Sequence, residues 1–421
     1  MSKGTQVFSI VAAVLILSPA FVFAAKQTSV VVEKPPSVSK IVAKPLMAAQ
    51  AFVKAEKWQD CLKSVLEAEA LPNKTPYEVF VVGDMLGYCG AKSADNVATL
   101  RGYESVIDSG LADKARTGGL LKGLMQITYN KKDYSKAIEY GNRSIRDGYA
   151  DEDVYVVIAQ AFYIQSDYKN TRSNLETWFA LADQPIATER VVPREATLQL
   201  YLSSCIKLSD DSCTLAALER TVANYPKADN WLNLVGAIFR SSSNDKSLLN
   251  VYRLAKEVGA VRRSDDFLEM AQLAIDQGLP GEAQSAIESG LEAKAFESSR
   301  DLERAQRLLI TAKTQAATDR STLARQDKDA STAKTGTADI KLAQAYISYG
   351  DFVQAVATVQ RGITKGGLKT PNEAHLTLGI AQLRAGKKSE ALVAFKGVQG
   401  DAATLRLARL WGFRASSILP Y

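Results

Sequence analysis

The sequence holds few side chains of the kinds that carry out acid–base or nucleophilic catalysis. His375 is the only histidine in 421 residues, so a histidine triad, a multi-histidine metal site or a histidine proton shuttle would lack its partners. The stretch STAKTG, Ser331 to Gly336, contains the Ser-x-x-Lys and Lys-Thr-Gly words of penicillin-binding enzymes, but here the two words overlap, whereas those enzymes need them far apart. No Gly-rich phosphate loop or nucleophile elbow is present. We therefore predict no catalytic residue, no metal ligand and no cofactor.

The four cysteines are candidates for disulfide chemistry instead. They are Cys61, Cys89, Cys205 and Cys213, and four cysteines allow three sets of pairs. Cys205 is expected near the end of one helix and Cys213 near the start of its antiparallel partner, which brings their Cα atoms within the roughly 4.4–6.8 Å that a disulfide requires. Cys61 and Cys89 are expected on consecutive helices, with Cys89 about one turn too far along. We predict the Cys205–Cys213 bond and keep Cys61–Cys89 as a second candidate; small buried thiols are the alternative for both pairs.

The first residues have the pattern of an export signal. One lysine precedes an apolar run from Val7 to Leu17, and small residues follow Pro19. This pattern is typical of a signal peptide with cleavage after Ala24, which would place the mature chain in an oxidising compartment, periplasmic or secreted. The alternative is a retained membrane anchor, because the apolar stretch approaches the ~20 residues of a transmembrane helix.

Composition favours a soluble helical protein with a buried core. Apolar residues make up 46% of the sequence, charged residues 23%, and the formal net charge is +6. Basic and acidic residues alternate rather than cluster, which argues against nucleic-acid binding. Apolar residues recur at helical spacing and strand signals are scarce, so the elements that must position any site are helices.

A motif recurs after 34 residues. YNKKDYSKAIEY begins at Tyr129 and YIQSDYKNTRSN at Tyr163, and this period is that of a helix-turn-helix unit that stacks on copies of itself. Later segments such as LTLGIAQLRAGKKSEALVAF place small and aromatic residues at Gly379, Ala391 and Phe395. The pattern resembles the tetratricopeptide repeat. The resemblance covers about eight or nine units, some degenerate, between Val42 and about Gly400; an irregular α-helical domain is the alternative.

The resemblance implies an all-α fold, an α-solenoid of antiparallel helix pairs wound into a right-handed superhelix. We predict a signal peptide (1–24), a flexible linker (25–40), an N-terminal array (41–297), a charged helical connector (298–337) and C-terminal repeats with a capping helix (338–421). A disordered linker is the alternative for the connector, because its apolar density falls after Ile310.

The resemblance also implies a concave groove, lined chiefly by the first helix of each pair, that binds a peptide or a helix. The side chains expected in this groove are Lys122, Gln126, Tyr129, Asn130, Gln160, Tyr163, Asn233, Arg240, Gln272 and Gln344. We therefore expect a non-enzymatic interaction scaffold in the cell envelope, with a protein or peptide partner, no nucleic acid, and no integral membrane span after signal cleavage. The alternatives are a chaperone-like carrier for envelope proteins and an accessory subunit of a cell-wall-modifying enzyme.

Overall fold

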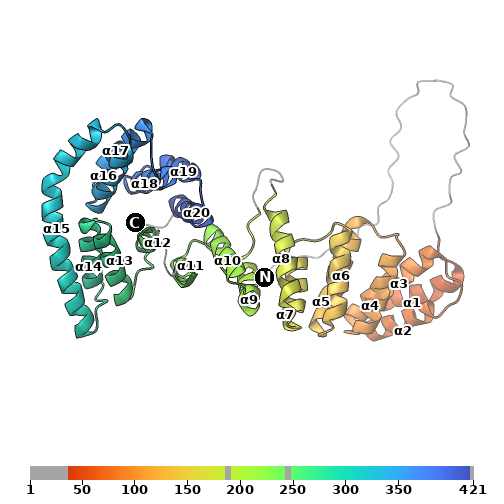
Figure 1. Ribbon diagram of the computed structural model, residues 1–421. Coiled ribbons are helices and arrows are strands. Elements are labelled where there is room, and N and C mark those ends of the chain that lie inside the picture. The colour runs from red at the N-terminus through yellow and green to blue at the C-terminus, as the bar shows by residue number, and fades with distance from the viewer. Residues whose placement is uncertain (1–36, 185–190, 242–247, 418–421) are drawn as a thin grey trace, which may run out of the picture. The chain divides into compact units, whose positions relative to one another are not determined.

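The computed structural model describes residues 37–184, 191–241 and 248–417. Within these ranges every regular element is an α-helix, and the helices are numbered α1 to α20 (Figure 1). The chain divides into two compact units after Ala112, and each unit is described by itself. The predicted signal peptide (1–24) and most of the predicted linker (25–40) lie outside the described residues.

The first unit consists of two helix pairs, α1 (Lys40–Lys54) with α2 (Trp58–Glu69) and α3 (Pro76–Lys92) with α4 (Asn96–Asp108). Helices α3 and α4 cross very closely because glycines lie where they meet. A Cβ atom added to Gly102 of α4 would lie 2.3 Å from the backbone nitrogen of Gly87 and 2.7 Å from the carbonyl oxygen of Gly83, both on α3. Any side chain at Gly102 would therefore force the two backbones apart.

The start of α3 is fixed by the carboxylate of Glu78. The Ser39 backbone N–H donates to Oε1 and the Thr75 backbone N–H donates to Oε2, both at 2.8 Å, while the Thr75 hydroxyl accepts from the Glu78 N–H. This is a capping box, which satisfies amides that the helix itself leaves open. Hydrogen bonds from Ser39, followed by the one from the Thr75 backbone, lower the pKa of Glu78 to about 2.

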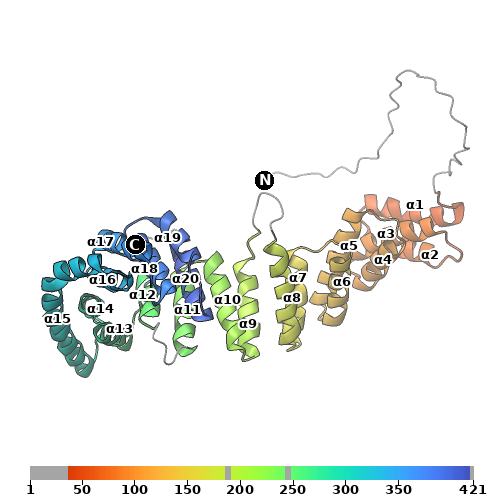
Figure 2. The same cartoon turned by 45° about the horizontal axis from the view of Figure 1, so that its top comes forward.

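The second unit begins with five consecutive helix pairs. They are α5 (Lys114–Asn130) with α6 (Tyr134–Arg146), α7 (Glu152–Ile164) with α8 (Tyr168–Ala182), α9 (Glu195–Lys207) with α10 (Asp211–Asn224), α11 (Ala228–Ser241) with α12 (Leu248–Glu257), and α13 (Ser264–Asp276) with α14 (Pro280–Glu292). In the first three of these pairs the first helices contact one another, α5 with α7 and α7 with α9, and Figure 2 shows these three pairs standing in a row. One face of this row is therefore made of first helices, as in a stacked repeat.

A long helix, α15 (Ser299–Thr332), interrupts the series of pairs before α16 (Thr337–Ser348) with α17 (Phe352–Lys365), α18 (Pro371–Arg384) with α19 (Lys388–Lys396), and the last helix α20 (Ala402–Ser416). Helix α15 has 34 residues and packs against α13, α14 and α16. Its fully buried side chains are alanines, Ala305, Ala312, Ala316 and Ala330, so it packs through small residues rather than through a broad apolar face. The predicted boundaries at 298 and 338 stay predictions, since the compact units divide elsewhere, after residue 112.

The turn inside each helix pair has one repeated geometry. In every such turn that the structure describes, the residue two positions before the second helix has a positive φ, as in Lys132 (63°), Ser166 (61°) and Gly350 (78°). The next residue is often aspartate: Asp133 and Asp167 accept hydrogen bonds from the backbone N–H three residues on, at 3.1 Å in both cases. Aspartate at this position satisfies an open amide at the start of the helix.

The repeated Tyr-x-x-x-Asp-Tyr motif joins the two helices of a pair across this turn. The rings of Tyr129 and Tyr134 lie 5.5 Å apart, and those of Tyr163 and Tyr168 lie 5.1 Å apart, both edge to face at 66°. Aromatic pairs prefer this arrangement over face-to-face stacking. The motif thus recurs because consecutive hairpins close in the same way.

The small residues of the repeat lie inside the packed core, as predicted. A Cβ atom at Gly379 would lie 2.3 Å from the ring of Phe395, and Ala391 is fully buried. Together with the series of helix pairs before and after α15, this confirms an all-α solenoid similar to tetratricopeptide repeats.

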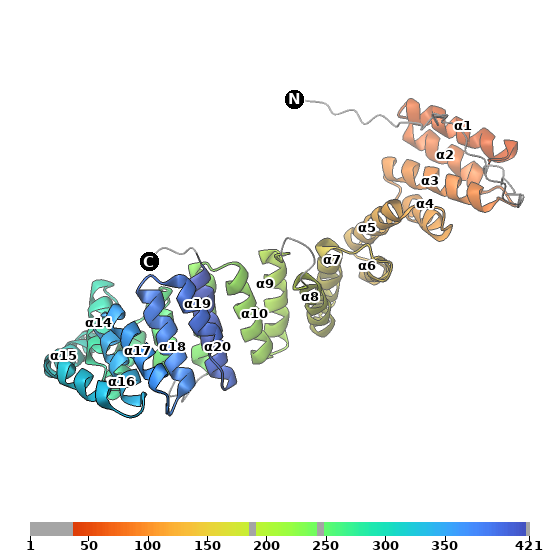
Figure 3. The ribbon, with the colours of Figure 1, turned by 90° about the horizontal axis from the view of Figure 1, so that it is seen from above.

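The last helix joins distant parts of the second unit. Helix α20 packs against α18 and α19 and also contacts α10 and α12; Figure 3 shows it beside α10 and α19. Trp231 of α11 and Trp411 of α20 are both fully buried in one apolar core that extends from α10 to α20. The segment from α10 to α20 therefore closes on itself.

Candidate functional site

A groove of about 530 Å³ lies on the face made by the first helices α5, α7 and α9. Its lining residues are Lys122, Gly123, Met125, Gln126, Asp153, Val156, Val157, Gln160, Arg194, Ala196 and Thr197. No residue of another described helix contributes to this lining. Packed helices lie about 8–10 Å apart, so the three helices present a groove about 20 Å across.

The floor and the walls of the groove differ in chemistry. Met125, Val156, Val157 and Ala196 supply apolar surface. Gln126 and Gln160 carry amides that can both donate and accept hydrogen bonds. This mixture of apolar floor and a few polar groups is typical of preformed ligand sites.

The charged side chains of the groove are already paired. Lys122 donates to Asp151, and Arg194 lies 2.8 Å from Asp153 and 3.2 Å from Glu152. Burial opposes the ionisation of Asp151, but the hydrogen bond and the charge of Lys122 outweigh it, so the pKa of this carboxyl lies below its ordinary value. Because these charged side chains are already paired with one another, an occupant would be recognised mainly by apolar contact and by hydrogen bonds.

The structure brings together three of the side chains predicted for a groove, Lys122, Gln126 and Gln160. The other predicted residues of these two helices lie at the helix ends. Tyr129 packs on its own hairpin, Asn130 accepts from the Gln126 amide at 2.9 Å, and the Tyr163 hydroxyl lies 2.7 Å from Ser203 Oγ.

The predicted residues of the later repeats lie elsewhere. Asn233 and Arg240 are exposed on α11. Gln272 donates to Asp276 on its own helix at 2.9 Å, and Gln344 donates to Glu373 at 2.9 Å beside a separate hollow along α15 and α16. The ten predicted side chains therefore do not form one continuous groove.

Sequence reasoning missed most of the apolar floor. Val156 and Val157 precede Gln160 by four and three residues, so they share its face of α7. This spacing could have identified them. Arg194 and Thr197 could not be assigned, because the first lies within, and the second just after, the irregular segment QPIATERVVPRE, where the repeat period is lost.

Buried carboxylates, each held between two basic side chains, fasten the second half of the chain. Glu219 of α10 accepts from Arg406 and Arg409 of α20, both at 2.7 Å. Glu257 at the end of α12 pairs with Arg384 of α18 and with Arg414 of α20. These contacts hold α18 and α20 against helices that lie more than 120 residues earlier in the sequence.

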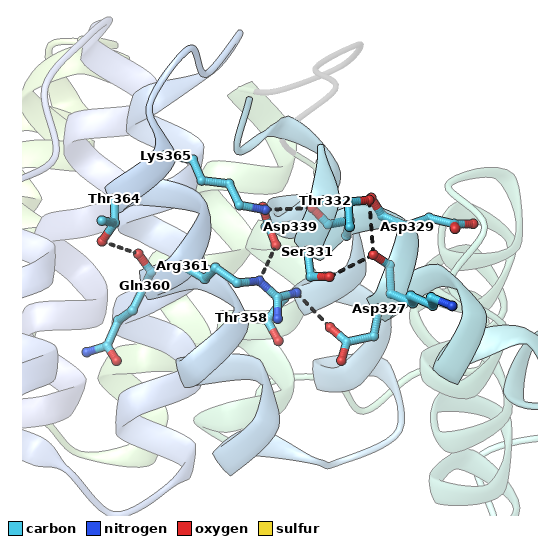
Figure 4. Close-up of polar contacts among 12 residues, drawn as sticks. Asp327, Asp329, Ser331, Thr332, Asp339, Thr358, Gln360, Arg361, Thr364 and Lys365 are labelled. Atoms are coloured by element: carbon cyan, nitrogen blue, oxygen red, sulfur yellow. Dashed lines mark hydrogen bonds and ion pairs between the residues drawn. The ribbon is translucent and has the colours of Figure 1, made fainter. Parts of the chain in front are cut away.

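A third carboxylate of this kind fastens α15 to the repeats that follow it. Asp339, whose side chain is fully buried, accepts from Arg361 at 2.6 Å and from Lys365 at 2.8 Å (Figure 4). Arg361 also donates to Asp327 of α15 at 2.6 Å, and Lys365 donates to the carbonyl oxygen of Ala330. Removing one partner from such a buried pair is strongly destabilising.

Both cysteine pairs lie at disulfide-bonding distance. The Cα atoms are 5.4 Å apart for Cys205 and Cys213 and 5.8 Å apart for Cys61 and Cys89. The second pair meets, contrary to the expected offset of one turn, because the connection 70–75 is long enough for α3 to shift along α2. Mass spectrometry without reduction should detect peptides joined through each pair; four free thiols in exported material would contradict this.

Other chemistry considered above finds no support among the described residues. His375 is half-buried, and its Nδ1 lies 3.0 Å from the carbonyl oxygen of Pro371 on its own helix. The STAKTG stretch consists of the last two residues of α15 and the connection to α16, and the Ser331 hydroxyl donates to the carbonyl oxygen of Lys328. Residues 37–184, 191–241 and 248–417 contain no group of three or more acidic, histidine or cysteine side chains placed to hold a metal ion, and none of their helices combines the length and the apolar character of a membrane span.

Comparison with known family models and with curated proteins gives no match. Several solved structures are remotely similar. A tetratricopeptide repeat protein from Parabacteroides merdae is 10% identical, with a TM-score of 0.29, over 79% of this chain and 99% of that one. A TPR2AB domain of yeast Sti1 in complex with pHSP90 is 15% identical, with a TM-score of 0.25, over 72% of this chain and 100% of that one. Yeast Tom70 is 10% identical, with a TM-score of 0.24, over 87% of this chain and 94% of that one. These similarities are too remote to indicate a partner, so the proposals below depend on the residues of this chain.

Proposed function

We propose that this chain is a non-enzymatic interaction protein that binds an extended peptide or a helix of a partner protein in the groove of α5, α7 and α9. The observation that carries the proposal is that three consecutive first helices line one groove with an apolar floor and amide side chains. Amides at Gln126 and Gln160 can bond the backbone of a bound segment irrespective of its sequence. A groove about 20 Å across accommodates about six residues in extended conformation.

We further propose that the chain works in the cell envelope, periplasmic or secreted. The N-terminal pattern of one lysine, an apolar run and small residues supports export. The two cysteine pairs at bonding distance also favour an oxidising compartment. Fractionation of cells that express the full chain, with N-terminal sequencing of the product, tests both cleavage after Ala24 and the location.

The groove is tested by placing a photo-reactive amino acid at Gln160 and crosslinking in living cells. The control carries the same photo-reactive group at Val353, which is 75% exposed on α17 and lies away from the groove. Crosslinks to one stoichiometric partner at Gln160 but not at Val353 support an interaction scaffold. Crosslinks to many unfolded chains would instead support a carrier.

A matched pair of variants then distinguishes binding in the groove from non-specific binding. Val157→Arg places a long charged side chain on the apolar floor, whereas Val353→Arg makes the same substitution at an exposed site. We expect the crosslinked partner to be lost only with Val157→Arg. Equal crosslinking by both variants would refute the groove, and hydrolysis of purified cell wall by the isolated protein would refute the non-enzymatic assignment.

A further inference from the structure

A second cavity, of about 290 Å³, lies inside the closed segment, away from the peptide groove. It is lined by residues of α20 and of each helix from α12 to α18, and by the turn before α17. The basic residues in its lining are Arg253, Lys256, Arg320 and Arg384. The acidic residues in its lining are Glu257, Glu282 and Glu288.

The carboxylates of this cavity are already neutralised by neighbouring cations. Arg253 and Glu282 form a buried pair with two donor nitrogens, each side chain about 10% exposed. Glu257 is shared by two arginines, Arg384 and Arg414. Glu288 lies 3.2 Å from Lys313 of α15, so its charge is also balanced.

Lys256 has no carboxylate at ion-pair distance among the described residues. Its ammonium group donates to the hydroxyl of Ser285 at 2.8 Å and to the carbonyl oxygen of the same residue at 3.2 Å. An ammonium group has three N–H donors, and the third has no partner in the described parts of the chain. Burial lowers the pKa of Lys256, and the nearby carboxylates Glu282 and Glu288 offset this only in part.

Arg320 is the second basic side chain without a carboxylate at ion-pair distance in the described residues. Its guanidinium lies 4.5 Å from the ring centroid of Tyr349, so the ring orients it at the edge of the cavity. Tyr349 is held in turn by a hydrogen bond to Asp319 at 2.7 Å. The Tyr349 ring also packs directly against Gly281 of α14. Only glycine fits there, because a Cβ atom at this position would lie 2.4 Å from the ring.

We propose that this cavity binds a small oxyanion with at least two negative charges, held by Lys256 and Arg320. The two basic side chains without an ion-pair partner leave excess positive charge in its walls, which favours an anionic ligand and disfavours a cationic one. Phosphate esters and polycarboxylates share the required chemistry, and the cavity is near the lower end of the size range of small-molecule sites. The proposal is independent of the peptide groove, with which the cavity shares no lining residue.

The test is calorimetric titration of the protein purified from cells that express the full chain, with inorganic pyrophosphate and citrate as probes at matched ionic strength. We expect saturable binding of at least one probe. Binding of pyrophosphate alone assigns a phosphate ligand, and binding of citrate alone assigns a carboxylate ligand. Absence of saturable binding of both probes up to about 10 mM, an affinity too weak for a specific site, would overturn the proposal.

Variants show whether bound anions occupy this cavity. Lys256→Met and Arg320→Gln should each weaken binding about tenfold or more, because a hydrogen bond to a charged group is lost, whereas Lys256→Arg should retain most of the affinity. Lys396→Met and Arg300→Gln remove exposed charges elsewhere on α19 and α15 and should leave binding unchanged. Equal weakening by these controls, or full binding by both cavity variants, would overturn the proposal. Arg320 is exposed on α15, so its variant remains informative if Lys256→Met fails to fold.

Discussion

Substituting Gly102 by alanine should test the close crossing of α3 and α4 directly. The added Cβ atom would lie 2.3 Å from the Gly87 nitrogen and 2.7 Å from the Gly83 oxygen. Both are backbone atoms, so no side chain can turn away, and the helices must separate by about 1 Å to restore ordinary contact. Overpacking costs about 1–3 kcal/mol, and alanine returns up to about 1 kcal/mol of helix propensity. We expect a net loss of about 1–2 kcal/mol.

The assay is calorimetric melting of the wild type and two variants. A loss of this size should lower the melting temperature of the first unit by about 5–15 °C, since a domain of 60–100 residues loses about 4–8 °C per kcal/mol. The control is Gly119→Ala in α5, where an added Cβ atom meets nothing within 4 Å, and it should stabilise the protein by about 0.5–1 kcal/mol. If Gly102→Ala stabilises the first unit as much as the control stabilises the second, the helices do not cross as described.

Three further substitutions have expected signs. Glu257→Gln should destabilise the protein by about 3 kcal/mol in chemical denaturation, because two arginines lose their buried carboxylate, whereas the exposed Glu303→Gln should change stability by no more than about 0.5 kcal/mol; equal effects would contradict the closure of the second unit. The carboxylate of Glu78 has a pKa of about 2 in the folded protein and a higher one when unfolded, so it stabilises the fold above about pH 4.5 and this contribution is lost as the pH falls towards 2. The difference in melting temperature between the wild type and Glu78→Gln should therefore be constant near neutral pH and shrink in acid; a difference that grows in acid would refute this. Ser166→Gly should raise the unfolding free energy by about 0.5–1 kcal/mol, because the residue has a φ of 61° that glycine adopts without strain; a fall would show that the serine is not strained there.

The repeats could be predicted from the sequence because their signals are local. Gly379, Ala391 and Phe395 occupy the small and aromatic positions of one repeat. Small residues at helical spacing indicate that another helix packs closely against them. The backbone conformation of the turns could not be predicted throughout, because non-glycine residues such as Lys132 and Ser166 occupy the position with positive φ. There the geometry is imposed by the packing of the two helices rather than by the residue itself.

The closure of the second unit could not be predicted for a different reason. Glu219 and Arg406 are separated by 187 positions, and no periodic pattern relates two charges at that distance. The groove could be predicted in part. Gln126 and Gln160 could be placed by their positions in the repeat, whereas the position of Arg194 beside the groove depends on an irregular connection. Local spacing thus determines the repeats, and tertiary contacts determine which of their surfaces stay open.

The contacts of α20 with α10 and α12 limit how this protein can change in length. An open solenoid can gain or lose a repeat at either end, since each repeat touches only its neighbours. Here a duplication anywhere between α10 and α20 would carry Arg406 and Arg414 away from Glu219 and Glu257. A gain or loss of whole repeats between α10 and α20 would therefore break this closure, so homologues of different length should keep a constant number of helices in that segment.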